Sequence, residues 1–150
     1  MNSLATLALQ ELHRRQASIA EAVAMHRYPR ARGETNLKLW LAIALTAGAP
    51  PRDCAEVIAH WQDECDYSDT VARLILLDGG PPREAWSAEL VRARDAASSK
   101  ARACPADRAA QDRSLTLQCL AIALGVPPER AGDPLAAHRD NDHATQREAA

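Results

Sequence analysis

The chain of 150 residues contains no phenylalanine and only two tyrosines, so aliphatic side chains and three tryptophans, Trp40, Trp61 and Trp86, must build its core. Because small alanines are abundant, we expect helices that approach one another closely. No apolar run reaches the eighteen or so residues that a membrane-spanning helix needs. The N-terminal stretch lacks a basic segment before its apolar part, and we therefore expect a soluble protein that is not exported and does not bind a membrane.

Cysteine pairs at the spacing of metal or redox sites are also absent. The four cysteines, Cys54, Cys65, Cys104 and Cys119, include no Cys-x-x-Cys pair. Cys54 and Cys65 share one face of a predicted helix, and Cys119 lies in an apolar run. We expect these three thiols to be buried and not joined by disulfides.

Excess charge of either sign is lacking, since 18 basic and 20 acidic residues give a formal net charge of −2. This balance removes the general electrostatic attraction for nucleic acid, and we do not expect the protein to bind it. Lys38 and Lys100 are the only lysines among many arginines. Together with the abundant alanine, this usage indicates GC-rich coding and a bacterial source, and we expect a cytoplasmic location.

The motif Gly-x-Pro-Pro occurs three times, each time between an apolar run and a charged one. It begins at Gly48, Gly79 and Gly125. Glycine can adopt the left-handed conformation that ends a helix, and proline is favoured at the first position of the next one. The motif therefore predicts helical hairpins.

Apolar residues at helical spacing predict an all-α protein of about seven helices. The expected helices cover 4–25, 37–45, 52–65, 71–77, 83–97 and 105–124, with one more short helix before residue 139. We predict one helical domain over 1–139 and a disordered polar tail over 140–150. The string Leu-Ala-Ile-Ala-Leu occurs at both 41–45 and 120–124, so a compact bundle and a short solenoid-like array both remain open.

Several boundaries of these helices can also be predicted. Pro29 and Gly33 are expected to break the chain between the first two helices, and Thr35 or Asn36 to cap the second. The helix from 83 is expected to fray within 96–100, and Pro105 to open the next helix.

Charge is distributed unevenly along the chain. A basic stretch lies between the first two helices, and an acidic stretch lies between the third and fourth. Their charged members are Arg27, Arg30 and Arg32, and Asp63, Glu64, Asp66 and Asp69. Arginine pairs with carboxylates through two parallel hydrogen bonds, so we predict that both stretches bind protein partners or associate head to tail in a homo-oligomer. Two alternatives stay open: the stretches meet within one monomer and neutralise each other, or the basic stretch is a solvated loop.

A metal site is an alternative interpretation of the region 53–69. Glu56, His60 and Glu64 follow one another at intervals of one helical turn, and Asp63 is adjacent. Oxygen and nitrogen ligands could therefore converge on one ion. The matching Glu-x-x-His elements of a two-metal bundle are lacking, and a solvated helix face explains the same pattern.

Residues 120–131 resemble the Leu-Ala-x-x-Leu-Gly-Val turn of phage-repressor-like helix-turn-helix domains. The resemblance implies a DNA-binding regulator acting through residues 120–139. The segment departs from the family pattern because Gly132 and Pro134 interrupt the recognition helix and acidic residues outnumber arginines from residue 114 onward.

Motifs of nucleophilic catalysis are missing, since no serine has a Gly-x-Ser-x-Gly setting. No sequence feature points to a cofactor. We therefore expect a non-enzymatic interaction module, such as an adaptor, a chaperone or a regulatory subunit.

Overall fold

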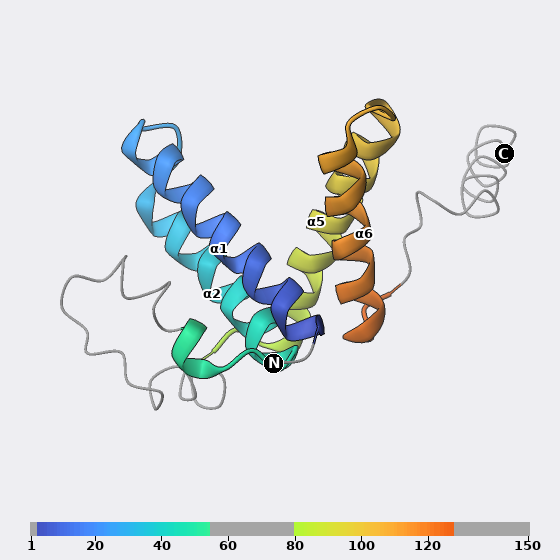
Figure 1. Ribbon diagram of the computed structural model, residues 1–150. Coiled ribbons are helices and arrows are strands. Elements are labelled where there is room, and N and C mark those ends of the chain that lie inside the picture. The colour runs from blue at the N-terminus through green and yellow to red at the C-terminus, as the bar shows by residue number, and fades with distance from the viewer. Residues whose placement is uncertain (1–2, 55–79, 128–150) are drawn as a thin grey trace, which may run out of the picture. The chain divides into compact units, whose positions relative to one another are not determined.

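Every regular element in the part of the chain that the structure describes is helical. The computed structural model describes residues 3–54 and 80–127. They form α1 (Ser3–Ala24), α2 (Arg30–Thr46), α5 (Arg83–Ala103) and α6 (Arg108–Ala123), with a helical turn at 51–54 (Figure 1). The all-α class is confirmed for these residues. The count of about seven helices is not confirmed, because the helices expected at 71–77 and beyond 128, and most of the one at 52–65, lie outside them.

Two compact units divide the chain, Met1–Leu90 and Val91–Ala150, and their boundary falls within α5. The first unit contains α1, α2 and the first two turns of α5. The second contains the remainder of α5 and α6. A single domain over 1–139 with a polar tail at 140–150 stays a prediction.

Glycine ends two of the described helices as the Gly-x-Pro-Pro motif predicts. Gly48 and Gly125 have φ values of 97° and 67°, in the left-handed region. After α2, the amides of Gly48 and Ala49 bond back to Leu45 and Ala44, and the same pair of bonds closes α6. Both ends are Schellman motifs, in which otherwise unpaired carbonyls find donors. The hairpins themselves are not confirmed, because one flanking helix of each motif lies largely or wholly outside the described residues.

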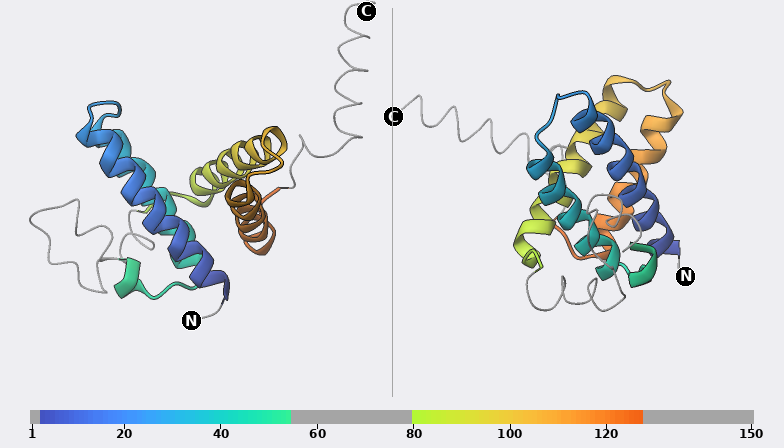
Figure 2. Two further views of the ribbon diagram at one scale, coloured as in Figure 1. Left: turned by 45° about the horizontal axis from the view of Figure 1, so that its top comes forward. Right: turned by 90° about the vertical axis from the view of Figure 1, so that its left-hand side faces the viewer.

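The helices α1 and α2 run side by side (Figure 2). Their contact depends on Gly33, where an added Cβ would lie 2.6 Å from Cγ2 of Ile19. The expected break at Gly33 is therefore wrong, because α2 begins at Arg30 and uses this glycine for close approach of α1. The expected cap is wrong as well: the N-cap is Pro29, and the Thr35 hydroxyl donates to the carbonyl of Ala31 within the helix.

The middle of α2 is surrounded on all sides, as its apolar sequence predicts. The five residues from Trp40 to Ala44 are 0% exposed. Leu12 of α1, Leu90 of α5 and Cys54 are equally buried. The predicted burial of Cys54 and Trp86 is thus confirmed, whereas Cys65 and Trp61 lie outside the described residues.

The second unit corrects three expectations. The helix α5 continues through 96–100 to Ala103, because the Ser98 side chain is buried and bonded to Ser114 of α6. The helix α6 begins after Asp107, whose carboxylate accepts from the amide of Ala110 at 3.1 Å, and not at Pro105. Cys119 is exposed, because its face of α6 points away from the buried positions Leu117, Leu120 and Ala121.

Replacing Gly33 by alanine should destabilise the protein by about 1–3 kcal/mol, because the new methyl group overlaps Ile19. The same change at an exposed helix interior normally stabilises by up to about 1 kcal/mol. A destabilised Gly33→Ala variant therefore indicates close packing at this position. Urea unfolding of Gly33→Ala measures the change. Thr35→Ala, two residues further on an exposed face of α2, is the matched control and should change stability by less than about 0.5 kcal/mol. A stabilised Gly33→Ala variant would contradict the close contact of α1 and α2.

Candidate functional site

An exposed, positively charged turn joins α1 to α2. We call it the basic turn and define it as His26, Arg27, Arg30 and Arg32. All four side chains are exposed. The turn follows a third Schellman motif, in which the amides of His26 and Arg27 bond back to the carbonyls of Val23 and Ala22. Here histidine, with φ of 54°, occupies the left-handed position that glycine takes after α2 and α6.

The arginines of the basic turn make surface contacts that are weak in water. Arg30 Nε lies 3.2 Å from Glu34 Oε1, one helical turn away. The Arg32 guanidinium stacks 5.1 Å above the ring of Tyr28, and Arg27 donates to the Met25 sulfur at 3.5 Å. The first turn of α2 carries no acidic residue and no side-chain cap. Since the N-terminal end of a helix is itself partly positive, the turn is a concentrated positive site.

A second group of charges is buried in the first unit, and we call it the Glu89 cluster. The Glu89 side chain is 8% exposed, and its Oε1 accepts from Asn36 Nδ2 at 3.0 Å and from Trp40 Nε1 at 3.2 Å. Arg15 Nη1 lies 3.7 Å from the same oxygen, while its Nε donates to Glu11 at 3.1 Å. The Arg15 guanidinium also stacks 4.3 Å above the Trp40 ring.

The Glu89 cluster connects three helices and is charge-balanced. Glu11 also pairs with Arg14 at 4.0 Å, so two carboxylates meet two guanidinium groups. Each buried polar group thereby gains a partner, which is the condition for burying it without a large loss of stability. These contacts fit a structural role. Sequence reasoning missed the cluster, because its members lie far apart in the chain. The available signal was Glu89 itself, an acidic residue one helical turn after Trp86, which is predicted to lie in the core.

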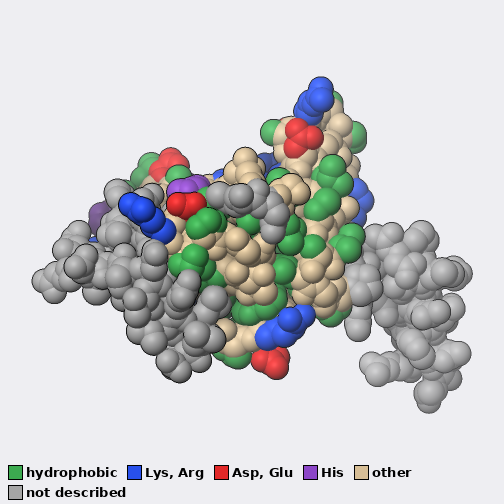
Figure 3. Space-filling model, turned by 60° about the horizontal axis from the view of Figure 1, so that its bottom comes forward, with side chains coloured by type: hydrophobic (Ala, Val, Ile, Leu, Met, Phe, Trp, Pro, Cys, Tyr) green, Lys and Arg blue, Asp and Glu red, His purple; other side chains and the backbone are tan. Residues whose placement is uncertain are grey.

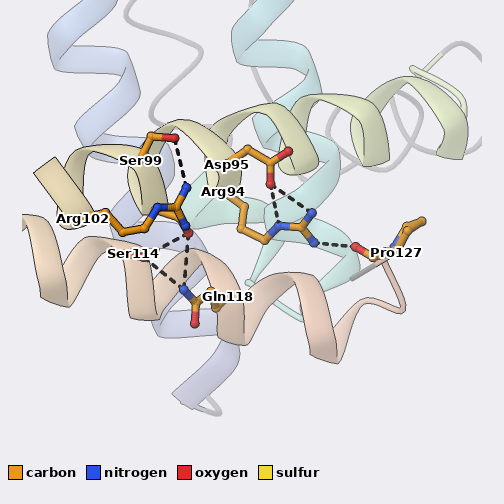
Figure 4. A network of polar contacts seen from close by, with 8 residues as sticks. Arg94, Asp95, Ser99, Arg102, Ser114, Gln118 and Pro127 are labelled. Atoms are coloured by element: carbon orange, nitrogen blue, oxygen red, sulfur yellow. Dashed lines mark hydrogen bonds and ion pairs between the residues drawn. The ribbon is translucent and has the colours of Figure 1, made fainter. Parts of the chain in front are cut away.

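A polar depression lies between α5 and α6 of the second unit. Its volume is about 290 Å³, and Ser98, Arg102, Pro105, Gln111, Ser114 and Gln118 line it together with Ala101. The hydroxyls of Ser98 and Ser114 lie 3.3 Å apart, and the Gln118 amide donates to both (Figure 4). Nearby, the buried Arg94 guanidinium bonds to Asp95 and to the carbonyl of Pro127, which fastens the chain after α6 to α5.

The described cysteine thiols differ in their surroundings. Burial, with a smaller contribution from the carboxylate of Asp53, raises the pKa of Cys54 to about 12. This thiol therefore stays protonated at neutral pH, which excludes it as an activated nucleophile. Cys104 and Cys119 are free and exposed.

The acidic and metal-site predictions fall outside the described residues. This holds for Glu56, His60, Asp63, Glu64, Asp66 and Asp69. Residues 3–54 and 80–127 contain no group of three metal-ligating side chains, and none of their helices is long and apolar enough to cross a bilayer.

The helix-turn-helix alternative also stays a prediction, because residues 128–139 of its segment are not described. The described part, 120–127, ends α6 and turns at Gly125. On the face drawn in Figure 3, charged side chains of the described residues are scattered among hydrophobic ones.

Replacing Glu89 by glutamine should destabilise the protein by about 1–3 kcal/mol, because Asn36, Trp40 and Arg15 lose a charged acceptor. Thermal or urea unfolding measures the effect. Glu84→Gln is the matched control: this residue is exposed on the same helix, and its loss should cost less than about 0.5 kcal/mol. If the two substitutions changed the free energy of unfolding equally, the hydrogen bonds and ion pairs of the Glu89 cluster would make no specific contribution to stability.

Replacing His26 by glycine should stabilise the protein by about 0.5–1 kcal/mol, because glycine adopts the left-handed conformation without steric cost. His13→Gly is the control, and it should change the stability in the opposite direction. His13 is exposed in the middle of α1, where glycine costs about 1 kcal/mol. Unfolding curves of both variants test the assignment, and a destabilised His26→Gly would contradict the Schellman motif at this turn.

No protein-family model, curated protein or solved structure matches this chain. Its function must therefore be inferred from its own residues. Three local features are available for that inference: the basic turn, the Glu89 cluster and the polar depression.

Proposed function

We propose that the protein is a non-enzymatic interaction module of a bacterial cytoplasm, an adaptor, chaperone or regulatory subunit, that binds an acidic segment of a protein partner through the basic turn. The observation that carries the proposal is the exposure of Arg27, Arg30 and Arg32 at one helix connection. Each guanidinium can hold a carboxylate through two parallel hydrogen bonds.

The local energetics of the turn support a binding role. Cationic side chains near the positive end of α2 lower the stability of that helix, and acidic residues there would raise it. Histidine in place of glycine at position 26 adds a further local cost. An anionic partner would relieve the first cost, because its carboxylates neutralise the arginines and the helix end together.

An acidic protein segment fits the turn better than nucleic acid does. Nucleic-acid affinity depends on many phosphate contacts and a basic surface, whereas the chain carries a net charge of −2. One possible source of the acidic segment is the stretch Asp63, Glu64, Asp66 and Asp69 of a second copy. That source would make the protein a homo-oligomer, and a different protein would make it an adaptor.

The triple variant Arg27→Glu/Arg30→Glu/Arg32→Glu tests the proposal. Its affinity for a fluorescein-labelled oligoglutamate peptide should fall by at least about tenfold relative to the wild type, and wild-type binding should weaken with added salt. Fluorescence anisotropy measures both. The matched control is Lys38→Glu/Arg92→Glu/Arg108→Glu, which makes the same change in net charge at exposed positions elsewhere.

Co-purification from a bacterial lysate and sedimentation of the purified protein then separate the two sources. An adaptor is supported if the control variant still co-purifies with protein partners that the basic-turn variant has lost. A homo-oligomer is supported if the control variant still self-associates and the basic-turn variant does not. Equal binding by both triple variants at low and high salt would mean that the basic turn is only a solvated connector.

A further inference from the structure

An exposed methionine adjoins the basic turn. Met25 directly follows α1, and 60% of its surface is exposed. Among the residues that the structure describes, Leu115 and Ile122 are the only other large apolar side chains with such exposure. The turn lies at the end of the α1 and α2 pair that is remote from the N-terminus (Figure 1). A single exposed apolar side chain is common in proteins, so the argument depends on what surrounds Met25.

The backbone holds Met25 beside the first arginine of the basic turn. The amides of Met25, His26 and Arg27 all bond back to carbonyls of α1, at 2.9 to 3.0 Å. The Arg27 Nη2 group lies 3.5 Å from the Met25 sulfur. An apolar side chain and a cation therefore form one continuous patch, which is ordered before a partner arrives.

A second arginine of the turn also contacts a polarisable side chain. The Arg32 guanidinium stacks 5.1 Å above the Tyr28 ring. Tyr28 itself packs against α2, since its Cδ1 atom would lie 3.8 Å from a Cβ added at Gly33. Stacking and a bond to sulfur leave N–H donors at the edges of both guanidinium groups, where carboxylates can bind.

The chemistry of Met25 and Arg27 favours an aromatic ring over other apolar groups. Methionine sulfur attracts aromatic rings, and its unbranched side chain adapts to the shape of a partner. A guanidinium is in turn attracted to the face of an aromatic ring. A ring placed on this patch gains both interactions, whereas an aliphatic side chain only covers apolar surface.

We propose that the acidic segment bound by the basic turn carries an aromatic side chain between its carboxylates. The ring lies against Met25, and the carboxylates pair with Arg27 and Arg32. This inference rests on the proposed function and adds the feature by which the turn distinguishes one acidic segment from another. An acidic segment without a ring binds through charge alone, so it gains nothing at Met25.

Oligoglutamate peptides with a central phenylalanine, serine or cyclohexylalanine, all carrying the same fluorescein label, test the proposal by fluorescence anisotropy. The wild type should bind the phenylalanine peptide at least about fivefold more tightly than the serine peptide. Cyclohexylalanine has a similar apolar bulk without an aromatic ring, and its peptide should bind about threefold more weakly than the phenylalanine peptide.

Met25→Gln should reduce the preference for phenylalanine over serine to less than about twofold and keep the wild-type affinity for the serine peptide. The residue is exposed, so the variant should fold, and a thermal melt checks this. Leu115→Gln is the matched control, because Leu115 is 61% exposed and undergoes the same chemical change in the other unit. It should bind all three peptides as the wild type does.

Three results would overturn the inference: equal wild-type affinity for the phenylalanine and serine peptides, equal affinity for the phenylalanine and cyclohexylalanine peptides, or a preference that Met25→Gln retains. If the serine peptide binds and the triple arginine variant loses it, the proposed function stands without this inference. If no peptide binds, both fail.

A further peptide separates the two sources of the acidic segment. The stretch 63–69 of this chain has the required pattern, because Tyr67 lies directly after Asp66 and two residues before Asp69. A labelled peptide of this stretch, with serine in place of Cys65, should lose affinity when its tyrosine is replaced by serine. Tighter binding than the phenylalanine peptide assigns the segment to a second copy, and weaker binding assigns it to a different protein.

Discussion

The arrangement of helices in the first unit depends on the buried carboxylate of Glu89. One oxygen of this group accepts from α2 through Asn36 and Trp40 and faces Arg15 of α1, so three helices converge on one negative charge. Such an arrangement is stable only when every member has its partner, because an unpaired charge in this position would cost far more than any one contact contributes. The stacking of Arg15 on Trp40 and its pair with Glu11 complete the balance. Helix positions in this unit are therefore fixed by directional bonds as well as by apolar packing, which has no directional preference of its own.

In the second unit, neutral polar groups connect α5 to α6, and one buried arginine holds the turn after α6. Ser98, Ser114 and Gln118 tie α5 to α6, and Arg94 fastens the turn that follows α6. Because alanines fill most of the remaining buried positions of α5, little apolar volume is available there, and polar bonds supply part of the specificity. The same scarcity leaves the polar depression open at the surface. A core short of large side chains thus accompanies the polar bonds between α5 and α6.

The basic turn is an exposed surface and contains no activated nucleophile. The buried Cys54 thiol is held protonated, and the buried carboxylates are compensated by guanidinium groups. The basic turn differs from these sites in that its charges are exposed and lie at a helix end that already carries partial positive charge. Glycine at position 26 and acidic residues in the first turn of α2 would make this turn more stable than it is. Such a local loss of stability is expected where a segment serves binding.

The sequence by itself determined where several helices end, because this depends on local chemistry. The string Leu-Ala-Ile-Ala-Leu is followed by Thr46, Ala47 and Gly48 at the end of α2 and directly by Gly125 at the end of α6. Both helices end in the same cap, with glycine in the left-handed region. Only the tertiary structure decided which faces are buried. Ile43 and Ile122 occupy the same position in that string, yet the first is 0% and the second 80% exposed. In the sequence alone, Gly33 suggests a helix break, whereas in the structure it lets α1 approach α2 closely. The partners of Glu89 and Ser98 come from other helices. Burial and pairing depend on neighbours distant in the chain, which no local pattern specifies.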